Sequence, residues 1–342
     1  MSGDTLLDVR ELATTFATEN GTVRAVDGVS FQVRANEVLG LVGESGCGKS
    51  VTAESIMRLL DPSTSRSDGQ VLFEGRDLLP LSPTEMARVR GNQLGMVFQD
   101  PLSALNPVFR IGDQLMEPMH THLQLDKRQA RQRAIGLLEQ TGIPDPGRRI
   151  DAYPHELSGG MRQRVMIAMA LACQPRLLIA DEPTTALDVT IQAQILELLE
   201  SLRASYSMGI VLITHDLSVV AQMCHRVVVM YLGQIIEQAD VETLFDRPAH
   251  PYTQGLMASA PSLDRPRRTR LHEIPGNVPA LERIPAGCRF APRCAYADDQ
   301  CRQAPQLRKV AAPEGGPPVG GHYVRCWHYE KIAARAAGRA SL

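Results

Sequence analysis

The chain has 342 residues, 44% of them hydrophobic, and its 36 Lys and Arg nearly balance 38 Asp and Glu, a formal net charge of -2. This balance argues against a protein that coats nucleic acid, which normally carries a broad basic face. No apolar run approaches the ~20 residues needed to span a bilayer, and no secretory signal pattern opens the chain. We therefore expect a cytosolic chain whose seven cysteines are thiols or metal ligands rather than disulfides.

Short apolar strands alternate with helical patterns over the first ~250 residues, which is the rhythm of a mixed α/β sheet. Strands are expected at 6–12, 29–33, 38–43, 94–98, 176–183 and 209–216, and a hairpin of 225–231 and 233–238 should turn at Gly233. Helices are expected at 51–60, within 111–141, at 165–172 and at 189–206. Beyond about residue 260, proline, arginine and glycine accumulate and the periodicity is lost, which indicates a boundary.

A glycine-rich loop follows the strand expected at 38–43. Residues 43–50 read GESGCGKS, a G-x-x-x-x-G-K-S pattern between a strand and a helix. Glycines let successive backbone N–H groups turn inward around an anion, and the positive end of the next helix points at the same place. Lys49 would reach the terminal phosphates and the Ser50 hydroxyl would ligate Mg²⁺. The pattern predicts an ATP-binding loop.

Two acidic residues end a later strand, in LLIADE at 177–182. A carboxylate at the C-terminal end of a parallel strand lies beside the phosphate loop of a neighbouring strand. Asp181 would hold Mg²⁺ through water. Glu182 would polarise the water that attacks the γ-phosphate, a positioning role typical of phosphoryl transfer.

The segment HELSGGMRQR at 155–164 predicts a second anion-binding helix start. Ser158 is a good helix N-cap, and two glycines follow it. One nucleotide rarely needs two complete phosphate cradles from one chain. We therefore expect a dimer in which the second cradle of each chain closes on the ATP of its partner.

With these motifs the sequence resembles the ATPase subunits of ABC transporters over almost its whole length. LSGGM at 157–161 matches the signature motif, and Gln99 in VFQDP matches the residue that senses the γ-phosphate and the membrane subunit. His215 in ITHD matches the switch histidine, and ALD at 186–188, which contains Asp188, matches the segment that links the two sites. Phe16 takes the place of the aromatic residue that stacks on adenine, which is more often tyrosine.

The resemblance implies a complete set of site residues. ATP would be contacted by Phe16, Gly43, Glu44, Ser45, Gly46, Cys47, Gly48, Lys49, Ser50, Val51, Ser158, Gly159, Gly160 and Asp188. Mg²⁺ would be held by Ser50, Gln99 and Asp181, and catalysis would use Lys49, Gln99, Glu182 and His215. The implied fold is an α/β P-loop NTPase of ABC type over 1–255, with a mixed sheet core, an antiparallel β subdomain and a helical subdomain at about 100–165. A small loop-rich extension would occupy 256–342.

The finer resemblance is to the importers of dipeptides and oligopeptides. It is carried by VFQDPLSALNPVFRIGDQL at 97–115, YPHELSGGMRQRVMIAMALAC at 153–173, IADEPTTALDVTIQAQIL at 179–196, and HPYTQGLMASAP at 250–261 with IPGNVP at 274–279. It implies an ATP-hydrolysing subunit that drives peptide uptake, peripheral on the cytoplasmic face of the inner membrane. Its partners would be two transmembrane permease subunits, which face 99–118, a second related ATPase in a heterodimer, and an external peptide-binding protein, but no nucleic acid.

Two alternatives stay open for the function. Related importers move nickel, glutathione or other small solutes with nearly the same ATPase, and the matching motifs are the machinery rather than the substrate pocket. A soluble ABC ATPase acting on nucleic acid or ribosomes is the other alternative. Such proteins usually carry a long coiled coil or two nucleotide units, whereas this sequence has no heptads and no internal repeat.

Four cysteines lie within forty residues near the C-terminus: Cys288, Cys294, Cys301 and Cys326. Their spacing lacks a paired C-x-x-C, so spacing alone leaves zinc, an iron–sulfur cluster and free thiols open. The resemblance to the extension of the peptide importers implies a [4Fe-4S] cluster, and a redox-sensing module is a further alternative. His322 and His328 could also serve as ligands, although we expect them to be exposed loop residues. Cys173 and Cys224 should be core residues, and 264–270 a solvated linker.

Overall fold

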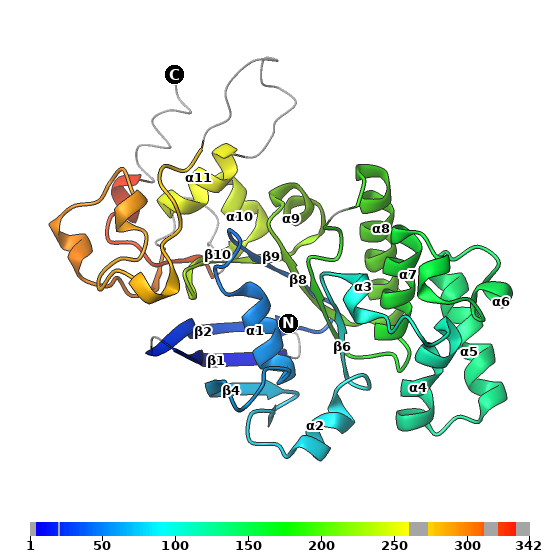
Figure 1. Cartoon of the computed structure of the whole chain (residues 1–342). Coiled ribbons are helices and arrows are strands. Elements are labelled where there is room, and N and C mark those ends of the chain that lie inside the picture. The colour runs from blue at the N-terminus through cyan, green and yellow to red at the C-terminus, as the bar shows by residue number, and fades with distance from the viewer. Residues whose placement is uncertain (1–4, 20, 186, 260–272, 311–320, 333–342) are drawn as a thin grey trace.

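The computed structural model describes residues 5–19, 21–185, 187–259, 273–310 and 321–332. The strands are β1 (Thr5–Thr18), β2 (Gly21–Arg34), β3 (Val38–Val42), β4 (Ser65–Phe73), β5 (Arg76–Asp77), β6 (Leu94–Val97), β7 (Leu177–Asp181), β8 (Gly209–Thr214), β9 (Arg226–Tyr231), β10 (Gln234–Asp240), β11 (Arg308–Lys309) and β12 (Tyr323–Val324). They form one sheet in the order β11-β12-β10-β9-β3-β8-β7-β6 and a second sheet in the order β2-β1-β4-β5. Figure 1 shows both sheets with the helices around them.

The α-helices separate and cover these strands. They are α1 (Lys49–Met57), α2 (Pro83–Val89), α3 (Pro101–Ala104), α4 (Ile111–Leu123), α5 (Lys127–Gln140), α6 (Pro146–Arg149), α7 (Gly159–Ala170), α8 (Val189–Tyr206), α9 (Leu217–Met223), α10 (Val241–Asp246) and α11 (Pro251–Ser259). Short 3₁₀ turns are η1 (Pro154–Glu156), η2 (Leu281–Arg283), η3 (Ala291–Arg293) and η4 (Asp299–Arg302). Within the described ranges, no helix is both long and apolar enough to cross a membrane.

The larger sheet is mixed and has an apolar core on each face. β9, β3, β8, β7 and β6 run parallel, whereas β10 and β12 are antiparallel to their neighbours. Side chains alternate along β3, so that Val38 and Val42 pack toward the helical side while Leu39 and Leu41 pack toward α1 and the antiparallel sheet. A strand buried on both faces is uniformly apolar, and β3 is buried at every position.

The helices from α3 to α7 connect β6 to β7 and gather at one end of the molecule, on the right of Figure 1. Within this group α5 begins with a capping box, in which Asp126 accepts the backbone N–H of Gln129 and the Gln129 side chain accepts that of Asp126.

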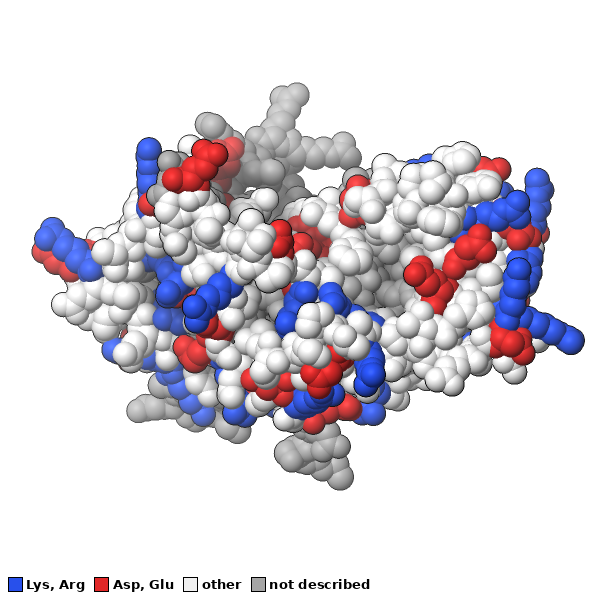
Figure 2. Space-filling model, turned by 60° about the horizontal axis from the view of Figure 1, so that its bottom comes forward, with Lys and Arg blue, Asp and Glu red and all other residues white. Residues whose placement is uncertain are grey.

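The surface carries charges of both signs. Basic side chains (Lys and Arg) and acidic side chains (Asp and Glu) are interspersed across the face shown in Figure 2.

Most predicted elements are present, and their bounds differ for local reasons. The hairpin turns at Leu232 and Gly233, both at positive φ, as a tight turn with the right-handed strand twist requires. The helix expected at 51–60 instead spans Lys49–Met57. It starts earlier because Gly48 caps it, and it ends earlier because Arg58 takes the left-handed conformation with φ 50°. β1 and β2 extend beyond the predicted strands. Their ends are half-exposed and carry polar residues, so an apolar pattern does not mark them.

The C-terminal extension is built onto the cassette rather than around an apolar core of its own. Tyr323 and Val324 of β12 pair with Gln238 and Glu237 of β10 and so lengthen the main sheet. Phe290 belongs to the main core, with its ring 5.4 Å from Tyr231. The predicted linker at 264–270 lies outside the described residues.

We predict that Phe290→Ala destabilises the protein strongly. The Phe290 side chain is 3% exposed and its ring also contacts Tyr252 and His250, so its removal leaves a cavity where the extension meets the sheet. The free energy of unfolding should fall by roughly 3–5 kcal/mol, measured by chemical denaturation. Phe109→Ala is the matched control, because Phe109 is 53% exposed and its loss should cost little. Equal effects of the two changes would contradict this packing.

Candidate functional site

The predicted phosphate loop runs from the end of β3 into α1. The Lys49 ammonium is buried and donates hydrogen bonds to the carbonyl oxygens of Gly43, at 2.8 Å, and Glu44, at 3.2 Å. Gly48 has φ 103°, and a Cβ there would lie 2.6 Å from the Ala25 carbonyl oxygen, so only glycine fits. The loop therefore has the backbone conformation and the charge that a phosphate cradle needs.

Asp181 lies beside the start of α1. It is 5% exposed, and its Oδ1 atom has no hydrogen-bond partner among the described residues. Burial raises the pKa of Asp181 above its ordinary value, although the Ser50 hydroxyl donates to this carboxylate and lowers it in part. An unpartnered buried carboxylate oxygen next to a hydroxyl is a donor set that suits Mg²⁺. These two residues fit the predicted metal role.

Glu182 accepts hydrogen bonds from three sides. Gln99 Nε2 lies 3.1 Å and Thr185 Oγ1 2.8 Å from its Oε2, and His215 Nδ1 lies 3.3 Å from its Oε1. Burial favours the neutral acid, but the hydrogen bonds from Thr185 and His215 outweigh it and hold the pKa of Glu182 below its usual value. Glu182 is therefore a carboxylate at neutral pH and is held in one orientation.

The signature residues lie in a second group at the starts of α7 and α8. Ser158 caps α7 and accepts the Met161 backbone N–H, and Asp188 caps α8 and accepts that of Ile191. A Cβ on Gly160 would lie 3.1 Å from Ile191, which shows how closely the two helix starts approach. Figure 1 shows α7 and α8 on the right of the molecule and α1 near its centre. One chain thus carries two separate groups of residues that are predicted to bind anions.

The remaining predicted ATP contacts lie on β1, in the loop itself and at the starts of α1 and α7. Phe16 is half-buried on β1. Two residues earlier on this strand, Thr14 Oγ1 lies 2.7 Å from Ser55 Oγ of α1, which ties the antiparallel sheet to the helix. Ser45 and Gly46 are exposed at the tip of the loop, and Val51 and Gly159 are on the first turns of α1 and α7. Burial raises the pKa of the Cys47 thiol, so this cysteine is a poor nucleophile.

Comparisons with known proteins agree with this geometry. A family model described as "ABC transporter" matches residues 26–185, and one described as "Oligopeptide/dipeptide transporter, C-terminal region" matches 236–301. The chain is 52% identical, over 96% of each chain, to the probable peptide ABC transporter ATP-binding protein y4tR of Sinorhizobium fredii. The chain belongs to the ABC transporter ATP-binding proteins. It is also 50% identical to the oligopeptide transport ATP-binding protein OppD of Bacillus subtilis, over 94% of this chain and 88% of that protein.

Solved structures show the same fold. The dimeric structure of the bacterial ABC transporter cassette MJ0796 superposes with a TM-score of 0.62 at 26% identity, over 69% of this chain and 98% of that one. The predicted family, the ABC-type α/β fold and the ATPase activity are confirmed. The match covers nearly all of that cassette and leaves about a third of this chain without a counterpart.

The four cysteines of the extension come together in space. Burial raises the pKa of Cys288, Cys294 and Cys326, that of Cys326 to about 12, and neighbouring cysteines add to each rise. The Cys288 backbone N–H also donates to the Cys301 carbonyl oxygen at 2.9 Å. None of the four forms a disulfide with another described residue, and Cys301 is the most buried of them. As predicted, Cys173 and Cys224 are buried in the core instead.

The expectation that His322 and His328 are exposed loop residues is wrong. His322 is 2% exposed, and its Nε2 lies 2.8 Å from Oε1 of the buried Glu237. His328 is 7% exposed and lies 3.0 Å from Asp298 and 3.7 Å from the Cys301 sulfur. Both histidines are buried because β12 pairs with β10 of the main sheet, which brings the segment that contains them against the cassette.

Sequence reasoning also missed residues that contact the site. Thr185 holds Glu182, and the side chain of Arg293 pairs with Glu44 of the phosphate loop. The Thr185 signal was available, because a hydroxyl three residues after an acid can hydrogen-bond to it. No local pattern marks Arg293, whose partner is 249 residues away.

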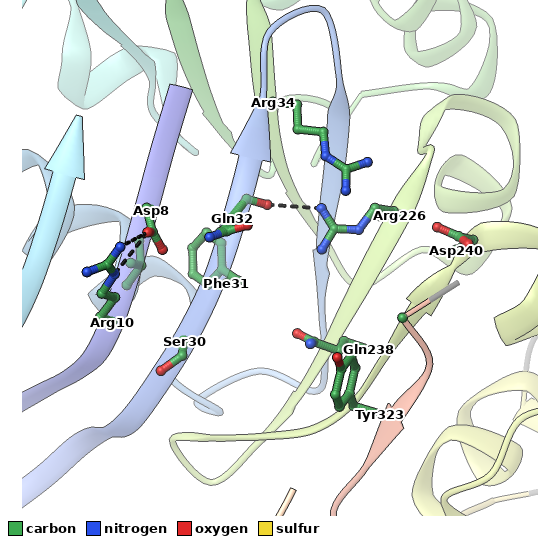
Figure 3. Close-up of a pocket in the computed structure, with 12 residues that line it drawn as sticks. Asp8, Arg10, Ser30, Phe31, Gln32, Arg34, Arg226, Gln238, Asp240 and Tyr323 are labelled. Atoms are coloured by element: carbon green, nitrogen blue, oxygen red, sulfur yellow. Dashed lines mark hydrogen bonds and ion pairs between the residues drawn. The ribbon is translucent and has the colours of Figure 1, made fainter. Parts of the chain in front are cut away.

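A separate hollow lies between the antiparallel sheet and the far end of the main sheet (Figure 3). It has a volume of about 650 Å³, and none of the predicted site residues line it. Two of its arginines have partners within the protein: Arg10 pairs with Asp8 at 2.6 Å, and Arg226 donates to the carbonyl oxygen of Gln32 at 3.2 Å. The hollow is therefore a junction between the two sheets.

Proposed function

We propose that this ABC ATPase powers the import of dipeptides or oligopeptides through a membrane complex. The observation that carries the proposal is the match of 236–301 to the C-terminal region of oligopeptide and dipeptide transporters. The names of relatives at about 50% identity support the same substrate class. The complex would contain two permease subunits, a second related ATPase and an external peptide-binding protein, and would place this chain on the cytoplasmic face of the inner membrane.

In the proposed cycle, residues around the phosphate loop act on one ATP, and residues at the starts of α7 and α8 act on a second ATP. Lys49 neutralises the terminal phosphates, while Ser50 and Asp181 hold Mg²⁺, with Gln99 alongside. Glu182 orients the attacking water, and His215 contacts the γ-phosphate. Ser158, Gly160 and Asp188 serve the nucleotide of the opposing subunit, which the separation of the two groups of residues supports. When bound, Mg²⁺ would neutralise charge on the phosphates.

The permease contact is supported by an apolar surface around Gln99. The described residues include six exposed large hydrophobic side chains, and four of these lie between positions 98 and 109. They are Phe98, Leu102, Val108 and Phe109. Such a patch on a chain otherwise rich in surface charge marks an interaction site. Its place next to Gln99 would link the permease to the hydrolysis site.

Transport by the reconstituted complex tests the proposed function. The chain, expressed with its neighbouring permease, ATPase and binding-protein genes, should co-purify with two membrane subunits and take labelled di- and oligopeptides into proteoliposomes. Glu182→Gln should keep ATP binding but abolish both ATP turnover and uptake. Uptake of nickel or glutathione in place of peptides would overturn the substrate assignment, and the absence of any membrane subunit would overturn the importer itself.

The hydrogen bond from Thr185 gives a prediction about pH. Thr185→Val removes a bond that lowers the pKa of Glu182, so the pKa rises and the carboxylate is lost at a higher pH. The acid limb of the ATPase pH profile should therefore move to higher pH. Thr185→Ser keeps the hydroxyl and is the matched control, with an unshifted profile. An acid limb that stays in place in Thr185→Val would argue against Glu182 as the group that activates water.

We further propose that Cys288, Cys294, Cys301 and Cys326 hold an iron–sulfur cluster. One tetrahedral zinc, with Zn–S bonds of ~2.3 Å, would need sulfurs about 3.8 Å apart. Among the described residues, the group whose ligand atoms all lie within 4.8 Å of one another is Asp298, Cys301 and His328, not the four cysteines. A wider set of four thiols suits a larger inorganic core. When bound, the cluster would cross-link four positions of a loop-rich segment.

Metal analysis distinguishes the cluster from zinc. Protein purified without oxygen should contain about four iron and four sulfide per chain, and Cys294→Ser should lose most of both. Cys173→Ser is the matched control, because Cys173 is buried and its sulfur lies 3.5 Å from the Pro118 carbonyl oxygen of α4, and it should keep the full content. One zinc per chain that survives Cys294→Ser and is lost in His328→Ala would instead assign a zinc site to Asp298, Cys301 and His328.

A further inference from the structure

We propose that Arg293 of the C-terminal extension is a positioning residue of the ATP site, acting through Glu44 of the phosphate loop. The inference rests on the proposed use of that loop for ATP, and it assigns to the extension a role in nucleotide binding. It goes beyond the cassette motifs, because neither residue of the pair belongs to the invariant part of the G-x-x-x-x-G-K-S pattern.

The contact is a bidentate ion pair that is largely buried. Arg293 donates from its two terminal nitrogens to the two carboxylate oxygens of Glu44, at 2.7 and 3.1 Å. The Arg293 side chain is 4% exposed and that of Glu44 28%. Bidentate arginine–carboxylate pairs are stronger and more directional than single hydrogen bonds. The pair therefore fixes the position of the Glu44 carboxylate.

Arg293 is itself fixed by the parts of the fold around it. Its Nε donates to the Pro275 carbonyl oxygen at 3.0 Å, and its guanidinium lies 5.9 Å from the ring centre of Tyr231. Tyr231 ends β9, which pairs with β3, the strand that leads into the phosphate loop. The arginine is thus anchored to the extension on one side and to the main sheet on the other.

A second anchor reaches Glu44 from the first turn of α11. The Glu44 backbone N–H donates to the Tyr252 hydroxyl at 2.8 Å. Tyr252 is held by the preceding turn, where its own N–H donates to His250 Nδ1 at 3.0 Å. The backbone N–H of His250 in turn donates to the buried Glu237. The HPY segment at 250–252 therefore connects the phosphate loop to β10.

Glu44 in turn contacts Lys49, the residue that is predicted to bind the phosphates. Its carbonyl oxygen accepts a hydrogen bond from the Lys49 ammonium at 3.2 Å. Glu44 is also an acid within a loop that binds anions, so an uncompensated carboxylate there would repel ATP. Arg293 supplies the compensating charge and keeps the carboxylate turned toward the extension.

Nucleotide affinity of the full chain tests the proposal. Magnesium ADP, which is not hydrolysed, should bind Arg293→Met roughly tenfold more weakly than the wild type by isothermal titration calorimetry, a change of about 1.4 kcal/mol. The matched control is Arg283→Met, at an exposed arginine on η2 of the same extension, and its affinity should be unchanged. In a Glu44→Gln background, Arg293→Met should weaken binding by less than half as much on a logarithmic scale, because no carboxylate remains to compensate.

The other outcomes are equally decisive. Wild-type affinity in Arg293→Met, or the same loss with and without the Glu44 carboxylate, overturns the proposal while leaving the ATPase assignment intact. A wild-type chain that binds no nucleotide overturns the use of the loop instead. If Arg293→Met does not fold, Tyr252→Phe keeps the proposal testable, since it removes only the hydroxyl that accepts the Glu44 N–H and should weaken binding several-fold. Unchanged affinity in that variant also counts against the proposal.

Discussion

Adjacent parallel strands of the main sheet end at one edge, and the candidate hydrolysis site depends on that alignment. β3, β8, β7 and β6 are neighbours in this order, with Val42 opposite Thr214 and Asp181 opposite Ile213. The residues that follow the strand ends are therefore brought to one place from four distant parts of the chain. They are Gly43, His215, Glu182 and Gln99. Backbone hydrogen bonding fixes these positions to within the precision that phosphoryl transfer needs.

The pKa values of the two acidic residues at the end of β7 are shifted in opposite directions. Burial raises the pKa of Asp181, and one of its carboxylate oxygens has no hydrogen-bond partner among the described residues, which leaves that oxygen available to a cation. Glu182 receives hydrogen bonds from Thr185 and His215, so its pKa is lowered and it stays an acceptor. Glu182 lies just past β7 with a left-handed φ of 46°, so its hydrogen bonds rather than strand alternation orient its side chain.

The parts that the sequence predicted are those set by local rules. The loop at 43–50, the acids after β7, the cap at Ser158 and the hairpin at Gly233 each have a spacing or residue type that only one local structure satisfies. The extension follows no such rule. His322 and His328 looked exposed because their segment has no periodicity, and they are buried because β12 adds to a sheet formed by residues 85 positions earlier. Long-range pairing of this kind leaves no signal in the neighbouring residues.

The extension and the phosphate loop constrain each other in both directions. Arg293 ends the short turn η3 and is followed at once by Cys294, so whatever orders the cysteines also orders the arginine that holds Glu44. Coupling between two sites is reciprocal in free energy, so a nucleotide that prefers the held loop must also stabilise the turn that holds it. The extension has too little regular structure to be rigid alone, and Phe290 and β12 supply the rigidity from the cassette. The four cysteines are thus linked, through Cys294 and the adjacent Arg293, to the loop that is predicted to bind ATP.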